Sequence, residues 1–397
     1  MSETARETWI TGVGIVSSLG EGLEAHWQAL NEGRLVFDDS YSPPFIVHRV
    51  PPIDFDKQIP KKGDQRQMEA WQRIGTYAAG LALDDAKIKG DSERLSTMDL
   101  IVAAGGGERD AAVDSAILSG LPKAANPAAF LNERLTSDLR PTLFLAQLSN
   151  LLAGNISIVH GVTGSSRTFM GEESSGVDAV RIALARIAAG QSEIGLVGGS
   201  YNADRKEQLF FLGFGSFNLE GAIRPVWERG PKGGFAIGSL GAFLVLEPRE
   251  HAESRGAKAL ARLTLVASEH TRREPGAVTD ALERMWARCA PKLEAGHYAV
   301  ISGATGAEPA TSEEREFFAR HPDIPVRATG AHFGHGVEAQ FVMNIALAVG
   351  AIQRGTLFPP LGDAGVEKPF AGTLRQAVVT SIGHWRGEGL ALVEAVN

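Results

Sequence analysis

The chain has 397 residues, of which 44% are hydrophobic and 22% charged, a composition typical of a soluble globular protein with a large core. Its formal net charge of −8 argues against a nucleic-acid partner and against an anionic-membrane surface. The single cysteine, Cys289, excludes an internal disulfide framework and any CxxC metal or redox site.

The first apolar stretch, residues 9–19, contains Gly12 and Gly14 and follows the acidic Glu3 and Glu7. It lacks the basic start of a signal peptide and is too short to cross a bilayer. We therefore expect a cytoplasmic protein without membrane insertion.

Short β-rich apolar runs alternate with amphipathic helical patterns along the chain, which is typical of βαβ units and a largely parallel sheet. The patterns predict strands at residues 9–11, 100–104, 194–197 and 242–246. They predict helices at residues 22–31, 70–86, 142–152, 174–189, 249–255 and 278–290. Prolines at 122, 127 and 141 mark residues 120–140 as a loop-rich excursion.

One internal echo divides the chain. Residues 241–247 (GAFLVLE) resemble residues 389–394 (GLALVE), and each segment follows a glycine-rich stretch. Because no low-complexity linker intervenes, we expect two similar halves, at residues 1–255 and 256–397.

Two segments carry a resemblance to a known family. Residues 9–17 (WITGVGIVS) precede a helix bearing Trp27, and residues 224–229 (RPVWER) lead to GFAIG at 234–238 and LVLE at 244–247. This pattern resembles the β-ketoacyl-acyl-carrier-protein synthases, the elongating condensing enzymes of fatty-acid and polyketide assembly. The resemblance covers nearly the whole chain. It implies an α/β thiolase-type fold, with two pseudo-repeated halves in a five-layer αβαβα arrangement, and it implies no cofactor.

The chemistry of that family requires a cysteine at a buried helix N-terminus and two histidines that stabilise an enolate. Aligned through Gly176, the cysteine position falls on Glu173. The histidine positions fall on Ala304 and Ala331, with His332 one residue late. A lysine of the family falls on Val326, and its Gly-Phe-Gly-Gly loop is eroded to GHWRG at residues 383–387.

A carboxylate is a poor nucleophile toward thioesters, so the resemblance implies that the chain does not condense by itself. Glu173 at a helix N-terminus is favoured as an anion by the helix dipole, whereas burial would raise its pKa. It could pair with a basic group such as Arg167 or Arg386, or act as a general base.

Three histidines fall in or beside the former active site: His332, His335 and His384. We expect them to fill space left by the lost machinery rather than to form a metal site, since no nearby Cys or Asp completes a ligand set. His332 could also replace part of the shifted histidine. Cys289 is expected to be a structural thiol.

An aromatic cluster surrounds Gly213 and Gly215: Phe210, Phe211, Phe214 and Phe217. In the resembling fold this loop lies near the acyl pocket. We therefore expect Phe214, together with Phe169 and Met170, to line a pocket, although core packing explains the cluster equally well.

The leading hypothesis is a non-catalytic, chain-length-factor-like pseudoenzyme that forms a heterodimer with a catalytic ketosynthase in fatty-acid, long-chain-acyl or polyene biosynthesis. One alternative is an enzyme of altered chemistry, a decarboxylase or hydrolase of malonyl or acyl thioesters with Glu173 as base and His332 as donor. Another is a homodimeric module that binds acyl-carrier protein.

Overall fold

Residues 6–108, 110–138, 147–219 and 221–396 are described by the computed structural model of the chain. Their strands form one sheet of 11, in the order β12-β11-β13-β14-β10-β1-β9-β7-β5-β6, with β2 beside β1. The strands of the first half are β1 (Thr8–Ser17), β2 (Gly20–Glu21), β5 (Asp99–Ala104), β6 (Ser166–Met170), β7 (Gly195–Tyr201) and β9 (Leu240–Pro248). Those of the second half are β10 (Ala261–Glu269), β11 (Tyr298–Ser302), β12 (Val326–Ala328), β13 (Gln376–Ile382) and β14 (Glu388–Glu394). A small separate sheet contains β3 (Asp38–Ser42), β4 (Phe45–His48) and β8 (Ile237–Gly238).

The strand order repeats in the two halves. From its outer edge inward, the first half has the order β6-β5-β7-β9-β1 and the second half has the order β12-β11-β13-β14-β10. If the two-residue β2 is left out and the strands of each half are numbered along the chain, both halves have the order third, second, fourth, fifth, first. The halves meet where β1 pairs with β10, at Trp9–Arg262 and Ile10–Ala261. The two segments of the internal echo, in β9 and β14, are the fifth strand of each half and occupy equivalent places.

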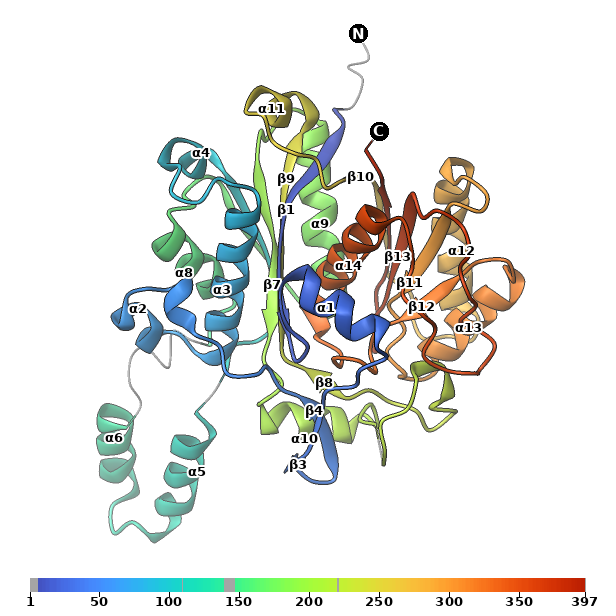
Figure 1. The fold of residues 1–397 in the computed structure, drawn as a ribbon. Coiled ribbons are helices and arrows are strands. Elements are labelled where there is room, and N and C mark those ends of the chain that lie inside the picture. The colour runs from blue at the N-terminus through green and yellow to red at the C-terminus, as the bar shows by residue number, and fades with distance from the viewer. Residues whose placement is uncertain (1–5, 109, 139–146, 220, 397) are drawn as a thin grey trace.

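Helices cover both faces of each half and produce five layers (Figure 1). The outer layer of the first half contains α3 (Ala70–Asp85) and α8 (Leu151–His160), and that of the second half contains α12 (Ala277–Cys289) and α13 (Ala310–Arg320). Between the two halves lie α9 (Glu173–Ala188) and α14 (Gln340–Arg354), which contact strands of both. The other helices are α1 (Gly22–Asn31), α2 (Lys62–Gln67), α4 (Ser92–Thr97), α10 (Lys206–Phe214) and α11 (Arg249–Ser254), with short 3-10 turns η1 (Phe55–Lys57), η3 (Val226–Glu228), η4 (Ala290–Lys292) and η5 (Val337–Ala339).

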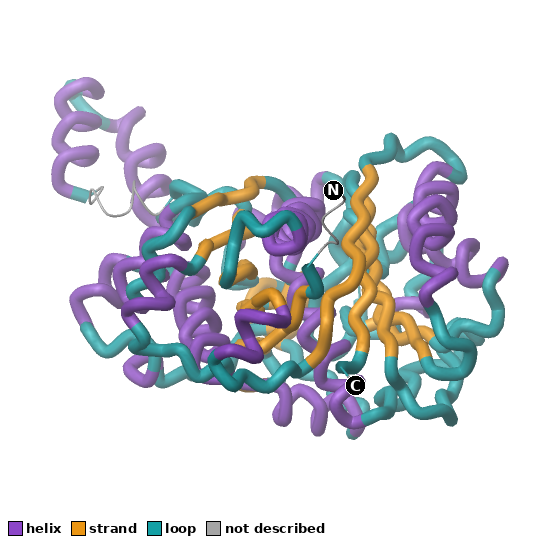
Figure 2. The backbone as a smooth tube through the Cα atoms, turned by 90° about the horizontal axis from the view of Figure 1, so that it is seen from above, coloured by secondary structure: helices purple, strands orange, loops and turns teal. Residues whose placement is uncertain are grey.

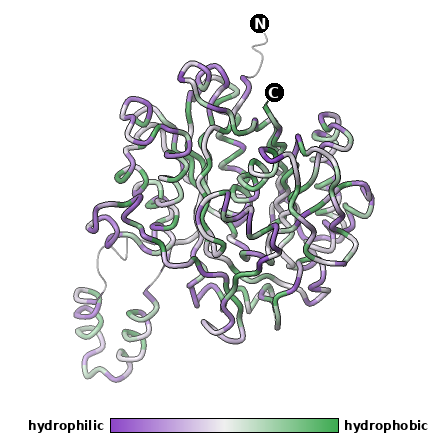
Figure 3. The backbone as a smooth tube through the Cα atoms, in the orientation of Figure 1, coloured by the Kyte–Doolittle hydropathy of each residue, from purple (hydrophilic) through white to green (hydrophobic). Residues whose placement is uncertain are grey.

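The central position of α14 follows from its composition. Every residue from Gln340 to Ile352 is buried, and a helix that is apolar all round is stable only inside a protein core. Figure 3 shows the apolar segments gathered in the strands and central helices. Close packing of β1 on α3 depends on Gly14, because a Cβ there would lie 2.1 Å from the carbonyl oxygen of Ala78.

A helical arm projects from the body (Figures 1 and 2). We use this name for residues 111–137, which contain α5 (Ala111–Gly120), η2 (Leu121–Lys123) and α6 (Pro127–Ser137). Within α5 and α6 only Ile117 is buried, while Leu118 is 69% exposed. The expected loop at residues 120–140 is therefore wrong over α6, because Pro127 is at the first helical position, where proline is tolerated, and Asn126 caps the helix.

The other predicted elements agree with the structure to within a few residues, apart from β1, β7 and β9, which are longer than expected. Residues 142–146 of the helix expected at residues 142–152 lie outside the described residues, whereas residues 147–150 are not helical and α8 begins only at Leu151, so the expected helix is wrong over residues 147–150. No helix in the described part of the chain is long and apolar enough to span a membrane.

Candidate functional site

The candidate site lies where loops from the second half meet the start of α9. Ala304 follows β11, Ala331 follows β12 and His384 follows β13, and these three strands run parallel. Their carboxyl ends therefore share one edge of the sheet. Glu173 is the first residue of α9 and is buried, with 2% of its surface exposed.

Two histidines bind one oxygen of Glu173. The Oε1 atom accepts hydrogen bonds from His335 Nε2 at 2.7 Å and from His384 Nδ1 at 2.8 Å. It also accepts the backbone N–H of His384 at 3.2 Å, while Oε2 is buried and has no hydrogen-bond partner in the described part of the chain. Phe235 lies edge-on to both imidazole rings, with ring centroids 4.9 and 5.4 Å away. We call Glu173, His335 and His384 the buried cluster.

Opposite charge dominates the electrostatics of the buried cluster. Burial alone would raise the pKa of Glu173, but the charge of His384 and hydrogen bonds from both histidines hold the pKa well below its ordinary value. Burial disfavours the His384 imidazolium, yet the Glu173 carboxylate outweighs burial and raises the pKa of His384. Glu173 is therefore an anion at neutral pH, which makes it a weak base.

The two alanines of the predicted site bring no polar side chain to it. Ala304 and Ala331 are both buried. Their loops are joined by the buried guanidinium of Arg229, which donates to the carbonyl oxygens of Thr305 and Gly330. This arrangement keeps the loops in place without the histidines that the resemblance implies.

His332 does not belong to the buried cluster. Its Nδ1 lies 3.0 Å from the carbonyl oxygen of Arg34, and its ring packs edge-on against Phe358. The expected basic partners of Glu173 also lie elsewhere. Arg167 donates to Ser165, and Arg386 lies 3.5 Å from Glu172 instead.

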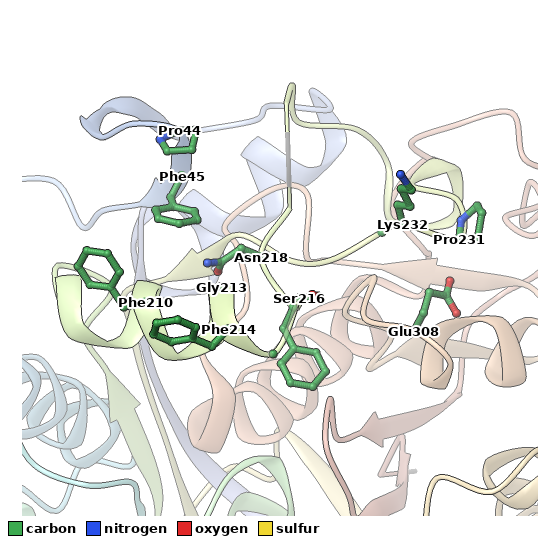
Figure 4. A pocket seen from close by; sticks show the side chains of 13 residues that line it. Pro44, Phe45, Phe210, Gly213, Phe214, Ser216, Asn218, Pro231, Lys232 and Glu308 are labelled. Atoms are coloured by element: carbon green, nitrogen blue, oxygen red, sulfur yellow. The ribbon is translucent and has the colours of Figure 1, made fainter.

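A cavity of about 750 Å³ opens between α10 and the loop that precedes β8 (Figure 4). Phe45, Phe210 and Phe214 form one wall, and Lys232 and Glu308 lie opposite (Figure 4). We call it the aromatic cavity. Of the three expected pocket residues, Phe214 lines this cavity.

The other two expected pocket residues lie on the edge strand β6. Met170 lines a second cavity, of about 420 Å³, which also contains His384 and which we call the inner cavity. Phe169 packs against the main core. Phe217 lines both cavities, and its ring lies 4.9 Å from that of His384.

The described residues contain no group of His, Cys, Asp and Glu side chains arranged to hold a metal ion. The members of the buried cluster bond to one another instead. Cys289 is buried, and burial raises the pKa of its thiol to about 12, which makes it inert near neutral pH.

The sequence predicts that the three members of the buried cluster lie in one region but does not pair them. Glu173 and His384 are 211 positions apart, so no periodicity or spacing relates them. The only available signal was the position of each residue in a segment of the resembling family.

The two halves have the same strand order and pack in five layers, with α9 and α14 in the middle. This arrangement is the thiolase-type fold. A family model for the N-terminal domain of β-ketoacyl synthases matches residues 5–252. The chain belongs to the β-ketoacyl synthase family.

Similar proteins agree with this assignment. The 3-oxoacyl-acyl-carrier-protein synthase 2 of Vibrio harveyi is 29% identical over 272 residues, which are 65% of this chain and 61% of that protein. The chain thus spans about six-tenths of the length of the curated relatives it matches.

Two solved structures share the fold. The structure of the ishigamide ketosynthase/chain length factor superposes with a TM-score of 0.79 at 19% identity and covers 99% of this chain and 100% of that chain. A type II polyketide acyl-carrier protein in complex with its ketosynthase gives a TM-score of 0.74 at 18% identity, with the same coverage. At these identities the likeness shows the fold alone.

Proposed function

We propose that this chain does not condense acyl groups by itself and acts as a chain-length-factor-like partner subunit of a catalytic ketosynthase in fatty-acid, long-chain-acyl or polyene biosynthesis. The observation that carries the proposal is the state of Glu173. It occupies the expected nucleophile position, is buried, and is held by two histidines through a single oxygen. Attack by such a carboxylate on a thioester would break these bonds and give a hydrolysis-prone anhydride.

The absence of histidine side chains at positions 304 and 331 also supports the proposal that the chain does not condense acyl groups by itself. An enolate oxygen requires preorganised hydrogen-bond donors, and each such donor typically contributes a factor of about 10²–10³ in rate. Ala304 and Ala331, at the two expected histidine positions, have methyl side chains. His335 and His384 already donate to Glu173, so those bonds are not available to a substrate.

Exposed apolar side chains support a protein partner. Of the ten large apolar side chains that are exposed in the described residues, seven lie on the arm, on α10, at the end of β6 or in the β13–β14 loop. They are Leu118, Leu135, Met170, Phe210, Phe211, Phe214 and Trp385. Leu118 on the arm shares a groove with Glu207 of α10, so the arm and α10 are neighbours. Exposed apolar surface of this kind is typical of an interaction site.

The edge of the large sheet adds a second docking element. Among the described residues strand β6 pairs only with β5, so its outer N–H and C=O groups face away from the sheet. An open edge can pair with a strand of another chain. Met170, which is 75% exposed, ends this strand and connects the edge with the apolar surface described above. An acyl-carrier protein would then be a shared partner of the assembled pair.

The test is the intact-complex mass of the protein isolated from its native cell through a tag on this chain. We expect a one-to-one complex with a ketosynthase that retains its cysteine. The double change Leu118→Asp and Leu135→Asp on the arm should abolish that complex. Phe37→Asp, at another exposed apolar residue, should not.

Two outcomes would contradict the proposal. One is condensation of acyl and malonyl carrier proteins by the purified chain alone. The other is a homodimer that binds acyl-carrier protein and no ketosynthase, which would favour the homodimeric binding module.

A further inference from the structure

The inner cavity lies at the carboxyl ends of three parallel strands, β5, β6 and β7. Gly105 follows β5, Met170 ends β6 and Tyr201 ends β7, and all three line the cavity. In open α/β sheets this position is the usual place for a ligand. The volume of about 420 Å³ is in the range of small-molecule sites.

His384 is one of the residues that line this cavity. Its Nδ1 is 2.8 Å from Glu173 Oε1, whereas its Nε2 has no hydrogen-bond partner among the described residues and is not sealed from solvent. By contrast, the Nε2 atoms of His48 and His332 are fully buried. His384 is therefore held at one nitrogen and open at the other.

A carboxylate on Nδ1 sets the chemistry of Nε2. Since an ionised carboxylate can only accept, the Nδ1 atom carries the proton, and in the neutral imidazole the lone pair lies on Nε2. The same division of roles is found in carboxylate–histidine pairs that serve as general bases. The backbone N–H of His384 and the side chain of His335 hold Glu173 in place, so the pair is rigid.

Tyr201 lines the same cavity. Its Oη has no hydrogen-bond partner among the described residues and is not sealed, while 95% of the residue's surface is buried (5% exposed). Burial raises the pKa of Tyr201, so the phenol stays protonated and can donate. Arg205 is a fixed part of the wall, because it donates to the carbonyl oxygens of Gly106 and Gly107 and pairs with Glu207.

We infer that Glu173 and His384 form a general-base dyad that hydrolyses activated acyl groups, thioesters or oxygen esters with a short apolar chain, in the inner cavity. His384 is the catalytic residue, Glu173 is a positioning residue, and Tyr201 donates to the carbonyl oxygen. The dyad itself contains no residue of the arm or of β6, but Met170 and Phe211 at the mouth of the cavity also belong to the exposed apolar surface proposed for the partner, so the activity is measured on the isolated chain.

Water is the only co-reactant that the hydrolysis requires. Nε2 takes a proton from water as the water oxygen bonds to the carbonyl carbon, giving a tetrahedral intermediate whose oxyanion accepts from Tyr201. The intermediate collapses with cleavage of the bond to sulfur or oxygen, and the imidazolium returns its proton to the leaving group. The products are a carboxylic acid and a thiol or alcohol.

The walls favour a short acyl chain. Leu212, Phe217 and Val337 give an apolar side to the cavity, and Met170 and Phe211 stand exposed at its mouth. Glu338 accepts the backbone N–H of Gly105 at 2.9 Å, and burial raises the pKa of its carboxyl to about 7. A long chain would have to leave the apolar side and pass this polar wall.

The charged groups around His384 predict the pH dependence. Burial lowers its pKa, Glu173 and Glu172 raise it, and Arg273 lowers it, with a net rise. The rate should therefore increase with pH through a value above the ordinary 6.5 of histidine. Replacing Glu173 by glutamine removes the largest raising group, so the rise in rate should move to lower pH.

The test is the hydrolysis of butyryl-coenzyme A and of p-nitrophenyl butyrate by the full-length purified protein. We expect His384→Gln to lose at least about 10²-fold in kcat/KM, and Tyr201→Phe to lose about 10²-fold in kcat. His332→Gln, at a buried histidine outside the cluster, should keep the activity. Circular dichroism of each variant checks that it is folded.

The inference is overturned if the wild-type protein hydrolyses neither substrate faster than buffer does, or if folded His384→Gln is as active as wild type. Hydrolysis of the oxygen ester alone would restrict the substrate class and keep the dyad. A pH profile of Glu173→Gln that coincides with wild type would remove Glu173 from the mechanism. The complex mass described above is measured separately, so failure of one proposal leaves the other standing.

Discussion

Replacing Glu173 by glutamine removes the negative charge of the buried cluster and keeps its shape. The glutamine carbonyl oxygen can take the place of Oε1 and accept the same hydrogen bonds, while its amide nitrogen takes the place of Oε2, which has no partner among the described residues. A hydrogen bond to a charged group contributes about 1 kcal/mol more than a neutral one. With two side-chain bonds from His335 and His384, the expected loss is about 2 kcal/mol in the free energy of unfolding.

The loss should depend on pH in a defined direction. Glu173 has a lowered pKa, so its contribution is present above the ordinary pKa of 4.5 and disappears as the pH falls. His384 has a raised pKa, so its contribution is complete below 6.5 and disappears as the pH rises through the folded value. The stabilisation by the pair is therefore complete between about pH 4.5 and 6.5.

The assay is urea unfolding of wild type and Glu173→Gln at about pH 5.5 and about pH 9. We expect the full difference at the lower pH and a smaller difference at the higher one. A difference that is equal at both pH values, or larger at about pH 9, would refute the ion pair as the source of stability.

Three further predictions concern other residues. Glu173→Cys alone should not restore condensation in an assay with acyl and malonyl carrier proteins, because Ala304 and Ala331 still provide no donor side chains. Burial raises the pKa of Glu314 to about 7, so the free energy of unfolding of wild type should fall as the pH rises from about 4.5 to 7. In urea unfolding, the stability of Glu314→Gln relative to wild type should therefore rise over the same range. Cys289 should resist a thiol reagent at neutral pH in the folded protein and react at once in urea, since its thiol is buried with a pKa of about 12.

The fold was largely predictable because its signals are local. Alternating strand and helix patterns predict the βαβ units, and the echo between residues 241–247 and 389–394 marks the fifth strand of each half. The arm was not predictable in the same way. Prolines at 122 and 127 are ordinary loop signals, whereas Pro127 begins a helix in which no side chain is buried by the described residues.

The sequence places Glu173, His335 and His384 in one region of the fold but does not pair them. Glu173 lies at the start of α9 as the alignment through Gly176 requires. Spacing alone does not predict that His335 reaches Glu173, because this contact depends on a turn at Gly334 (φ 76°) and on backbone bonds of His335 to Ala236 and Gly238. Those bonds direct His335 to Glu173, and they join segments about 100 residues apart.

The three members of the buried cluster depend on one another. A buried carboxylate without donors costs several kcal/mol, and removal of one partner from a buried ion pair costs about 3–5 kcal/mol. Glu173 is therefore stable at this position only with His384 and His335 in place, and His384 keeps its raised pKa only beside Glu173. Single reversions within the cluster should be strongly non-additive. This coupling indicates that a new set of interacting polar residues stands at the expected nucleophile position. If the position had only lost its cysteine, an apolar residue at position 173 would have filled the space without any histidine.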